Sequence, residues 1–196
     1  MASEFPSVRR ERADRTRNRE AILAAAREAF AHADFAGEAV SMNQIARAAG
    51  VGAATLYRHF PTREELALAV YQSKIEELTA RVRDRTRDRD ALASLRTWVE
   101  EFASFMLATR GMMDTLRASW QSATPFTAAA TTGVTTVVAA FLADGTRDGS
   151  IRGDLDAMDV TVALCALLGT TGPEDSGARA RRLLDLLIDS LAAQAE

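Results

Sequence analysis

Apolar residues recur every three or four positions along the first third of the chain. This spacing predicts a helix from about residue 16 to 32, because it places the side chains on one helical face. The members of this stripe are Ile22, Ala25, Ala26, Ala29, Phe30 and Ala33. Residues 1–15 are charged and lack such a period, so we expect a disordered arm there.

The stretch 41–60, SMNQIARAAGVGAATLYRHF, contains two short helical patterns on either side of a glycine. Ser41 and Gln44 have the spacing of a capping box, which begins a helix. Gly50 can adopt the left-handed conformation that a tight corner needs. Residues 53–59 then predict a second short helix. Two short helices joined by a tight turn are the plan of a helix-turn-helix motif.

The remaining two thirds of the chain keeps the helical period. Thr62 begins the next helix, and Asp90 and Asp156 are placed to cap two later ones. A loop with three glycines is expected over 144–153, and the last helix is expected over about 178–193. In all, the sequence predicts an all-α fold of about nine helices.

The last two predicted helices are apolar on nearly all sides. A helix of this kind must be covered on most of its surface. Neighbouring helices of the same domain can provide that cover. The alternative is a homodimer, in which this pair packs against its copy as a four-helix bundle. We favour the homodimer, because helix-turn-helix proteins usually bind paired half-sites on DNA.

Composition limits the kind of protein. Hydrophobic residues make up 47% and charged residues 26% of the 196 residues, which is ordinary for a folded soluble chain. Cys165 is the only cysteine, which excludes a disulfide within the chain and a zinc site built from several cysteines. The longest strongly apolar run, 160–169, is too short to span a bilayer. We expect a cytoplasmic protein without a cofactor.

Charge and chemistry favour a binding protein over an enzyme. The net charge is −3, but six arginines gather between residues 9 and 19. Such a cluster is either a solvated tail or a basic surface for DNA, and we assign Arg17 to DNA. His32 and His59 are the only histidines. The sequence shows no metal-ligand spacing, phosphate-binding loop or nucleophile–base pair, which argues against catalysis.

Three segments together resemble a known family. They are the first helix with Ile22 and Phe30, then SMNQIARAAGV, and then TLYRHFPTREEL. Over about residues 16–68 they resemble the N-terminal domain of TetR-type transcriptional regulators. The segments RHFPTREEL and RGMMDTL resemble a subgroup with an SbtR-like C-terminal domain.

This resemblance implies a helix-turn-helix DNA-binding domain over 16–62 and a ligand-sensing and dimerisation domain over 63–196. It also implies a homodimer, joined through the last two helices, that binds a palindromic double-stranded DNA operator. The family's usual mode is repression that a small effector releases, and we expect the effector to be mostly apolar. The alternatives are a helical DNA-binding dimer without a small-molecule ligand, and an activator.

The helix over 53–59 offers a face of small side chains to DNA. Ala53 and Ala54 can touch thymine methyl groups, and Thr55 can hydrogen-bond a base or a phosphate. Arg63 lies in the first turn of the following helix, where free N–H groups also favour a phosphate. Arg58 is either a phosphate contact or a solvated charge.

The family resemblance implies further DNA contacts. Tyr57 and His59 match positions whose side chains reach phosphates, although a packing role at the helix end is the alternative. Ser41 and Gln44 match positions that fix the register of the protein on DNA. Many members have a hydroxyl residue where Gly52 stands here. That contact is therefore missing, and the operator sequence stays open.

Large apolar side chains on the later helices are candidates for a ligand pocket. Aromatic rings and methionines suit an adaptable apolar cavity, but a plain hydrophobic core uses the same residue types. The sensing role that the resemblance implies favours a pocket for the set as a whole. Its members are Trp98, Phe102, Met106, Met112, Met113, Leu116, Trp120, Phe126 and Phe141.

Overall fold

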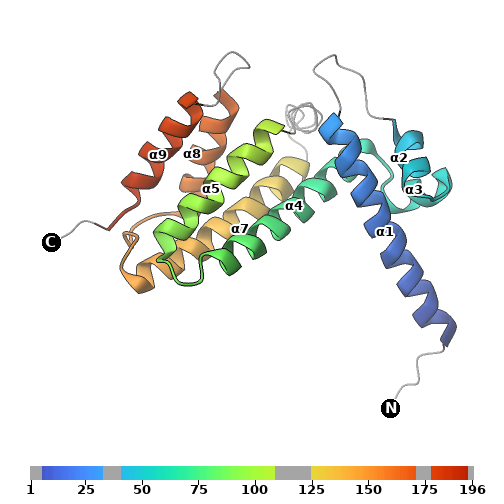
Figure 1. The fold of residues 1–196 in the computed structure, drawn as a ribbon, viewed down its shortest axis with the longest axis horizontal. Helices are drawn as coiled ribbons and strands as arrows, with labels where there is room; N and C mark the ends of the chain where they lie inside the picture. Colours follow the sequence, from blue (N-terminus) through green and yellow to red (C-terminus); the bar gives the residue numbers. More distant parts are fainter. Residues whose placement is uncertain (1–5, 33–40, 109–124, 171–177, 194–196) are drawn as a thin grey trace. The chain divides into compact units, whose positions relative to one another are not determined.

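The computed structural model describes residues 6–32, 41–108, 125–170 and 178–193. These residues form eight helices and no β-strand, close to the predicted helix count, which confirms the all-α prediction. The helices are α1 (Pro6–His32), α2 (Met42–Ala48), α3 (Ala53–His59), α4 (Arg63–Arg85), α5 (Ala91–Ala108), α7 (Pro125–Asp148), α8 (Ala157–Thr170) and α9 (Ala178–Ser190) (Figure 1).

The chain divides into two compact units. The first contains the described residues up to Tyr71, and the second contains those from Gln72 onward. The helix α4 is continuous and contributes its first turns to one unit and its remaining turns to the other. None of the helices in the described ranges is both long and apolar enough to cross a membrane.

The first helix begins earlier than its apolar pattern predicts. It starts at Pro6, so the expected disordered arm over 1–15 is wrong for residues 6–15. Proline suits the first helical position, and the arginine, glutamate and alanine residues that follow are strong helix formers. Apolar periodicity reports burial rather than helicity, and residues 11–20 are almost all exposed. The helix therefore carries a charged segment ahead of its buried stripe.

Backbone hydrogen bonds around Gly50 close the corner between α2 and α3. The φ angle of Gly50 is 67°, in the left-handed region. Its N–H donates to the Arg47 carbonyl at 3.1 Å, and the Val51 N–H donates to the Ala46 carbonyl at 3.0 Å. This pair of bonds is the Schellman motif, which satisfies carbonyl groups at a helix end. The predicted glycine corner is confirmed.

Of the helices α2, α3 and α4, only α4 begins with a side-chain cap. Ser41 is the N-cap residue of α2, but its hydroxyl makes no capping hydrogen bond, so the predicted capping box is wrong. The Ser41 carbonyl accepts the Ile45 N–H at 3.1 Å, and the helix therefore begins through its backbone alone. At α4, the Glu65 N–H donates to the Thr62 hydroxyl oxygen at 3.1 Å.

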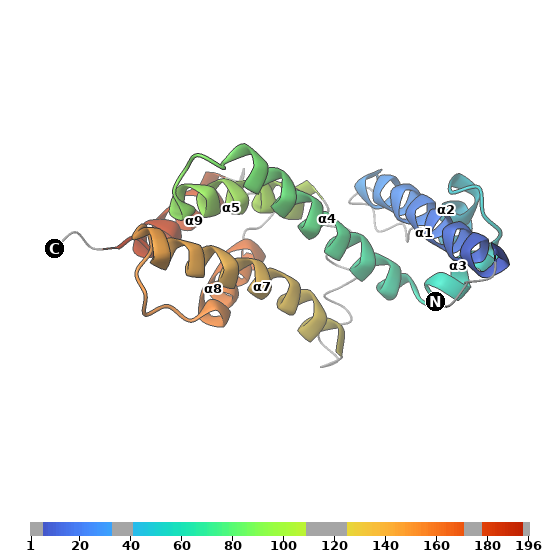
Figure 2. The ribbon, with the colours of Figure 1, turned by 90° about the horizontal axis from the view of Figure 1, so that it is seen from below.

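A cluster of rings lies in the core of the second unit. In this unit α7 contacts α5 and α8, and α9 also contacts α5 and α8 (Figures 1 and 2). The rings of Trp98 and Phe102 stack with centroids 5.0 Å apart, and the Phe141 ring lies 6.5 Å from Trp98. Trp98 Nε1 donates to the Thr79 hydroxyl oxygen at 2.9 Å, so its polar edge is satisfied.

The helix α7 extends into the loop that its glycines predict. It continues to Asp148, so the expected loop over 144–153 is wrong for residues 144–148. Gly145 lies inside the helix, and a Cβ at that position would overlap the Ile151 side chain. The glycine therefore serves close packing rather than a turn. The left-handed position falls instead at Gly149, with φ of 79°.

Candidate nucleic-acid interface

The second helix of the motif, α3, is buried along one face and exposed along the other. Leu56 is buried, as is Phe60, which directly follows the helix. Ala53 and Ala54 are exposed, and Thr55 is half-buried. The outer face therefore begins with small side chains, which permit another surface to approach the helix closely.

The last turn of α3 carries the larger polar side chains. Tyr57 is 45% exposed, which agrees poorly with a packing role. Arg58 is exposed and has no acidic partner among the described residues. His59 is half-buried. Burial, together with the nearby charges of Arg15 and Arg19, lowers the pKa of His59, which favours the neutral imidazole.

Two arginines of α1 that are not among the predicted DNA contacts lie near this turn. The guanidinium carbon of Arg19 is 5.6 Å from the centre of the Phe60 ring. Arg15 lies one turn before Arg19 on the same helical face. Arg17, which the sequence analysis selected, pairs with Asp14 at 2.9 Å and points elsewhere around the helix. Helical phase is the signal that separates these arginines, and the sequence contains it.

The other predicted contacts lie at the starts of α2 and α4. Ser41 is half-buried and Gln44 is exposed. Arg63 is half-buried in the first turn of α4, and its Nε atom is buried without a hydrogen-bond partner in the described part of the chain. The Nε–H group of Arg63 is thus a donor without a partner in the described part of the chain. Arg63 follows the motif closely in sequence and belongs to the same unit.

The predicted pocket residues fall into three groups. Trp98, Phe102 and Phe141 are at most 2% exposed and pack against one another, while Met106 is half-buried. Phe126 belongs to α7, but its side chain lies outside the described part. Met112, Met113, Leu116 and Trp120 lie outside the described residues.

A groove in the second unit lies elsewhere, against α4, α5 and α9. Its volume is about 570 Å³. Leu78 and Phe105 provide apolar lining, and Lys74, Arg81 and Arg181 provide basic lining. Of the predicted pocket residues whose side chains the structure describes, Trp98, Phe102, Met106 and Phe141, none lines this groove.

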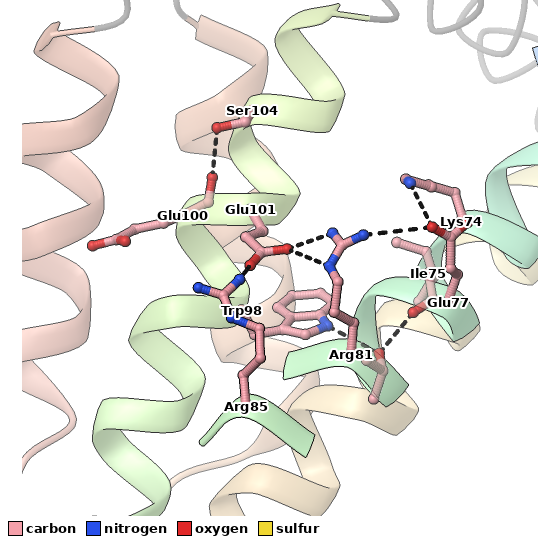
Figure 3. A network of polar contacts seen from close by, with 10 residues as sticks. Lys74, Ile75, Glu77, Arg81, Arg85, Trp98, Glu100, Glu101 and Ser104 are labelled. Carbon is pink, nitrogen blue, oxygen red and sulfur yellow. Dashed lines mark hydrogen bonds and ion pairs between the residues drawn. The ribbon is translucent and has the colours of Figure 1, made fainter. Parts of the chain in front are cut away.

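Ion pairs join α4 to α5 at one wall of the groove, and Figure 3 shows these pairs. Glu101 accepts from Arg81 Nε at 3.2 Å and from Arg85 at 2.6 Å. Lys74 pairs with Glu77 at 3.0 Å. Pairs as exposed as these contribute at most about 1 kcal/mol each. The cations on this wall are thus largely matched by acids of the same chain.

These features define a class of protein, an all-helical chain with a helix-turn-helix motif. The outer face of the second helix of that motif, α3, is exposed. The model for bacterial regulatory proteins of the tetR family matches residues 22–70. The model for the SbtR-like C-terminal domain of transcriptional regulators matches residues 90–193. The chain belongs to the TetR family of transcriptional regulators, and its C-terminal domain is of the SbtR-like type.

Individual relatives agree with this assignment. The TetR transcriptional regulator SCO0520 of Streptomyces coelicolor is 34% identical, with 90% of this chain and 99% of that one covered and a TM-score of 0.64. A TetR transcription regulatory protein from Mycobacterium vanbaalenii is 26% identical, with coverage of 93% and 99% and a TM-score of 0.60. The HTH-type transcriptional activator FasR of Mycolicibacterium smegmatis is 38% identical over 96 residues, which are 48% of this chain and 43% of FasR. The chain thus matches less than half of the length of FasR.

Proposed function

We propose that this protein is a ligand-responsive repressor that binds a palindromic operator as a homodimer. The observation that carries the proposal is the exposed face of α3, where Ala53 and Ala54 precede the exposed Tyr57. Small side chains let the helix approach base edges in the major groove, where thymine methyl groups offer apolar contacts. In this proposal Tyr57, His59 and Arg63 bind phosphates, and such contacts orient the protein on DNA.

The apolar surface of α8 and α9 supports the homodimer. Met158 and Val162 lie one turn apart on α8 and are 46% and 55% exposed, and Leu186 on α9 is 66% exposed. The two helices contact each other, so neighbours within the chain already cover their inner faces. The outer apolar side chains remain for a second copy, which would complete a four-helix bundle.

The effector is proposed to be a small, mostly apolar molecule. A cavity of several hundred Å³ is the usual size of a small-molecule site, and the groove against α4, α5 and α9 has this size. The packing of Trp98 with Phe102 and Phe141 favours a core role for these three rings. Titration of candidate compounds against operator binding tests the effector, and a DNA-binding dimer without a ligand would show no change in affinity.

The main experiment is recovery of the genomic DNA that the tagged protein binds in cells. Such binding requires that the protein lies in the cytoplasm with the genome, as we propose. We expect one palindromic sequence with half-sites about one helical turn apart. Neighbouring genes should be transcribed more when the protein is removed.

Because FasR is named an activator, activation is the second candidate function for this protein. Reduced transcription of the neighbouring genes on removal of the protein would support it. Absence of any enriched sequence would overturn the proposal.

A further inference from the structure

The buried stripe of α1 changes into a row of arginines toward the start of the helix. Ile22, Ala26 and Phe30 are at most 1% exposed and face the core of the first unit. Arg15 and Arg19 continue that row at the spacing of one helical turn, because side chains three and four residues apart share a face. Both arginines are exposed. The face that anchors α1 is therefore also the face that carries these two charges.

Neither Arg15 nor Arg19 has an acidic partner among the described residues. Arg17, between them in sequence, is paired with Asp14. Most arginines in the described part of the second unit are paired as well: Arg81, Arg83, Arg85, Arg87, Arg96, Arg147 and Arg152. Arg15 and Arg19 thus place two uncompensated like charges one turn apart, an arrangement that favours an external anion.

Both arginines of α1 lie near the end of α3, the second helix of the motif, within the same unit. The Arg19 guanidinium lies over the ring of Phe60, which directly follows α3. The charges of Arg15 and Arg19 both act on His59 in the last turn of α3. The planar guanidinium group presents a rigid fork of donors that matches phosphate oxygens. The Phe60 ring attracts the Arg19 guanidinium and so favours its position beside the end of α3.

We propose that Arg15 and Arg19 form a phosphate-binding face on α1 that contacts the DNA backbone beside the end of α3. This inference rests on the proposed function and names a contact surface for it. The ligand is the backbone of double-stranded DNA rather than its base edges. The surface should therefore raise affinity and salt sensitivity without changing sequence preference.

The test compares two double variants that remove the same number of charges. Arg15→Gln with Arg19→Gln removes the proposed face, while Arg87→Gln with Arg147→Gln removes two arginines that have acidic partners. Binding of a fluorescein-labelled duplex pool of random sequence is measured by anisotropy over a series of KCl concentrations. The recovered genomic site is measured in the same way. Phosphate contacts lower the logarithm of the binding constant by about 0.9 per contact for each logarithmic unit of salt.

We expect the Arg15/Arg19 variant to have a salt slope shallower by about 1.8 per bound protomer, since two contacts are lost. The Arg87/Arg147 variant should keep a slope close to that of the unchanged protein. Arg15→Lys with Arg19→Lys should restore most of the slope, because the charge is kept although the fork is lost. Circular dichroism melting of each variant separates a folding defect from a lost contact.

Two results would overturn the inference. The first leaves the proposed function standing, and the second contradicts the proposed function as well. If the unchanged protein binds DNA and both double variants show the same slope, the phosphate face is wrong while the proposed function stands. If the unchanged protein binds neither the random pool nor any recovered site, the proposed function fails together with the face.

Discussion

At the scale of single residues, Tyr57 and His59 carry the clearest expectation for DNA binding. The variant Tyr57→Ala with His59→Ala should stay folded, because Tyr57 is 45% exposed and neither residue belongs to the core. Hydrogen bonds to charged groups contribute about 1.5–3 kcal/mol, so affinity for the operator should fall by about tenfold or more. Sequence preference should change little, since phosphate contacts read no bases.

Anisotropy titration against the operator and against a scrambled duplex measures both quantities. Thr136→Ala on an exposed position of α7 is the matched control, and its affinity should equal that of the unchanged protein. Unchanged binding of the Tyr57/His59 variant would remove both residues from the interface.

Asp148 connects the end of α7 to the start of α5. Its carboxylate accepts the Ala91 N–H at 2.8 Å and the Ser150 N–H at 2.9 Å. The Ser150 side chain, the Ser150 and Ala91 N–H groups and the charge of Arg147 lower the pKa of Asp148. A lowered folded-state pKa means that the carboxylate stabilises the fold above its unfolded value of about 3.9. This contribution is lost as the pH falls through the folded-state pKa.

The variant Asp148→Asn should therefore lower the free energy of unfolding by about 1 kcal/mol at pH 7, because the amide has one acceptor oxygen for two N–H donors and carries no charge. The difference from the unchanged protein should shrink as the pH falls below about 4. Urea denaturation at several pH values measures this, with Asp88→Asn at an exposed position as control. A difference that is constant over that pH range would show that the carboxylate charge is not responsible.

At the scale of elements, the corner between α2 and α3 depends on Gly50. A Cβ at this position would meet no atom within 4 Å, so Gly50→Ala tests the backbone conformation alone. The left-handed φ of 67° should cost an alanine about 1–2 kcal/mol of stability. Gly133→Ala is the control, because Gly133 also has open space around it but lies within α7.

In a helix interior, alanine is more stable than glycine by about 0.5–1 kcal/mol. The two substitutions should therefore shift the urea midpoint in opposite directions. If Gly50→Ala left the midpoint unchanged, the corner would not require its left-handed residue.

Sequence periodicity predicted most elements but misplaced some of their ends. The α2–α3 corner and the helical character of α7 were predictable, because glycine chemistry and the three-to-four spacing are local signals. The start of α1 at Pro6 was missed, since its first turns are helical without being buried. The end of α7 was missed because Gly145 packs closely against the Ile151 side chain, a contact that arises only in the folded chain.

The candidate site was predicted less completely than the fold. The small face of α3 follows from its sequence. The DNA contact of Arg17 stays a prediction, and residue type alone did not indicate the ion pair of Arg17 with Asp14. The pocket prediction rested on residue type. Residue type does not distinguish an aromatic core, such as the Trp98–Phe102 stack, from an aromatic cavity.

At the scale of the whole molecule, the homodimer makes a separate prediction. Val162→Glu with Leu186→Glu should leave the chain folded, since both side chains are more than half exposed. Buried in an interface, the unpaired carboxylates would oppose association, so the variant should be monomeric in sedimentation velocity. Its affinity for the palindromic operator should fall steeply, while a control substitution at the exposed Ala139 of α7 should change neither property.

The measurement that tests the central claim most directly is a hydroxyl-radical footprint of the purified protein on its recovered DNA site, with the bound mass determined in parallel. Our account predicts two protomers and two symmetric protected segments about one helical turn apart. Substitution of Tyr57 and His59 should weaken both segments equally. Protection without symmetry, or binding that is equally strong on every duplex tested, would contradict the account.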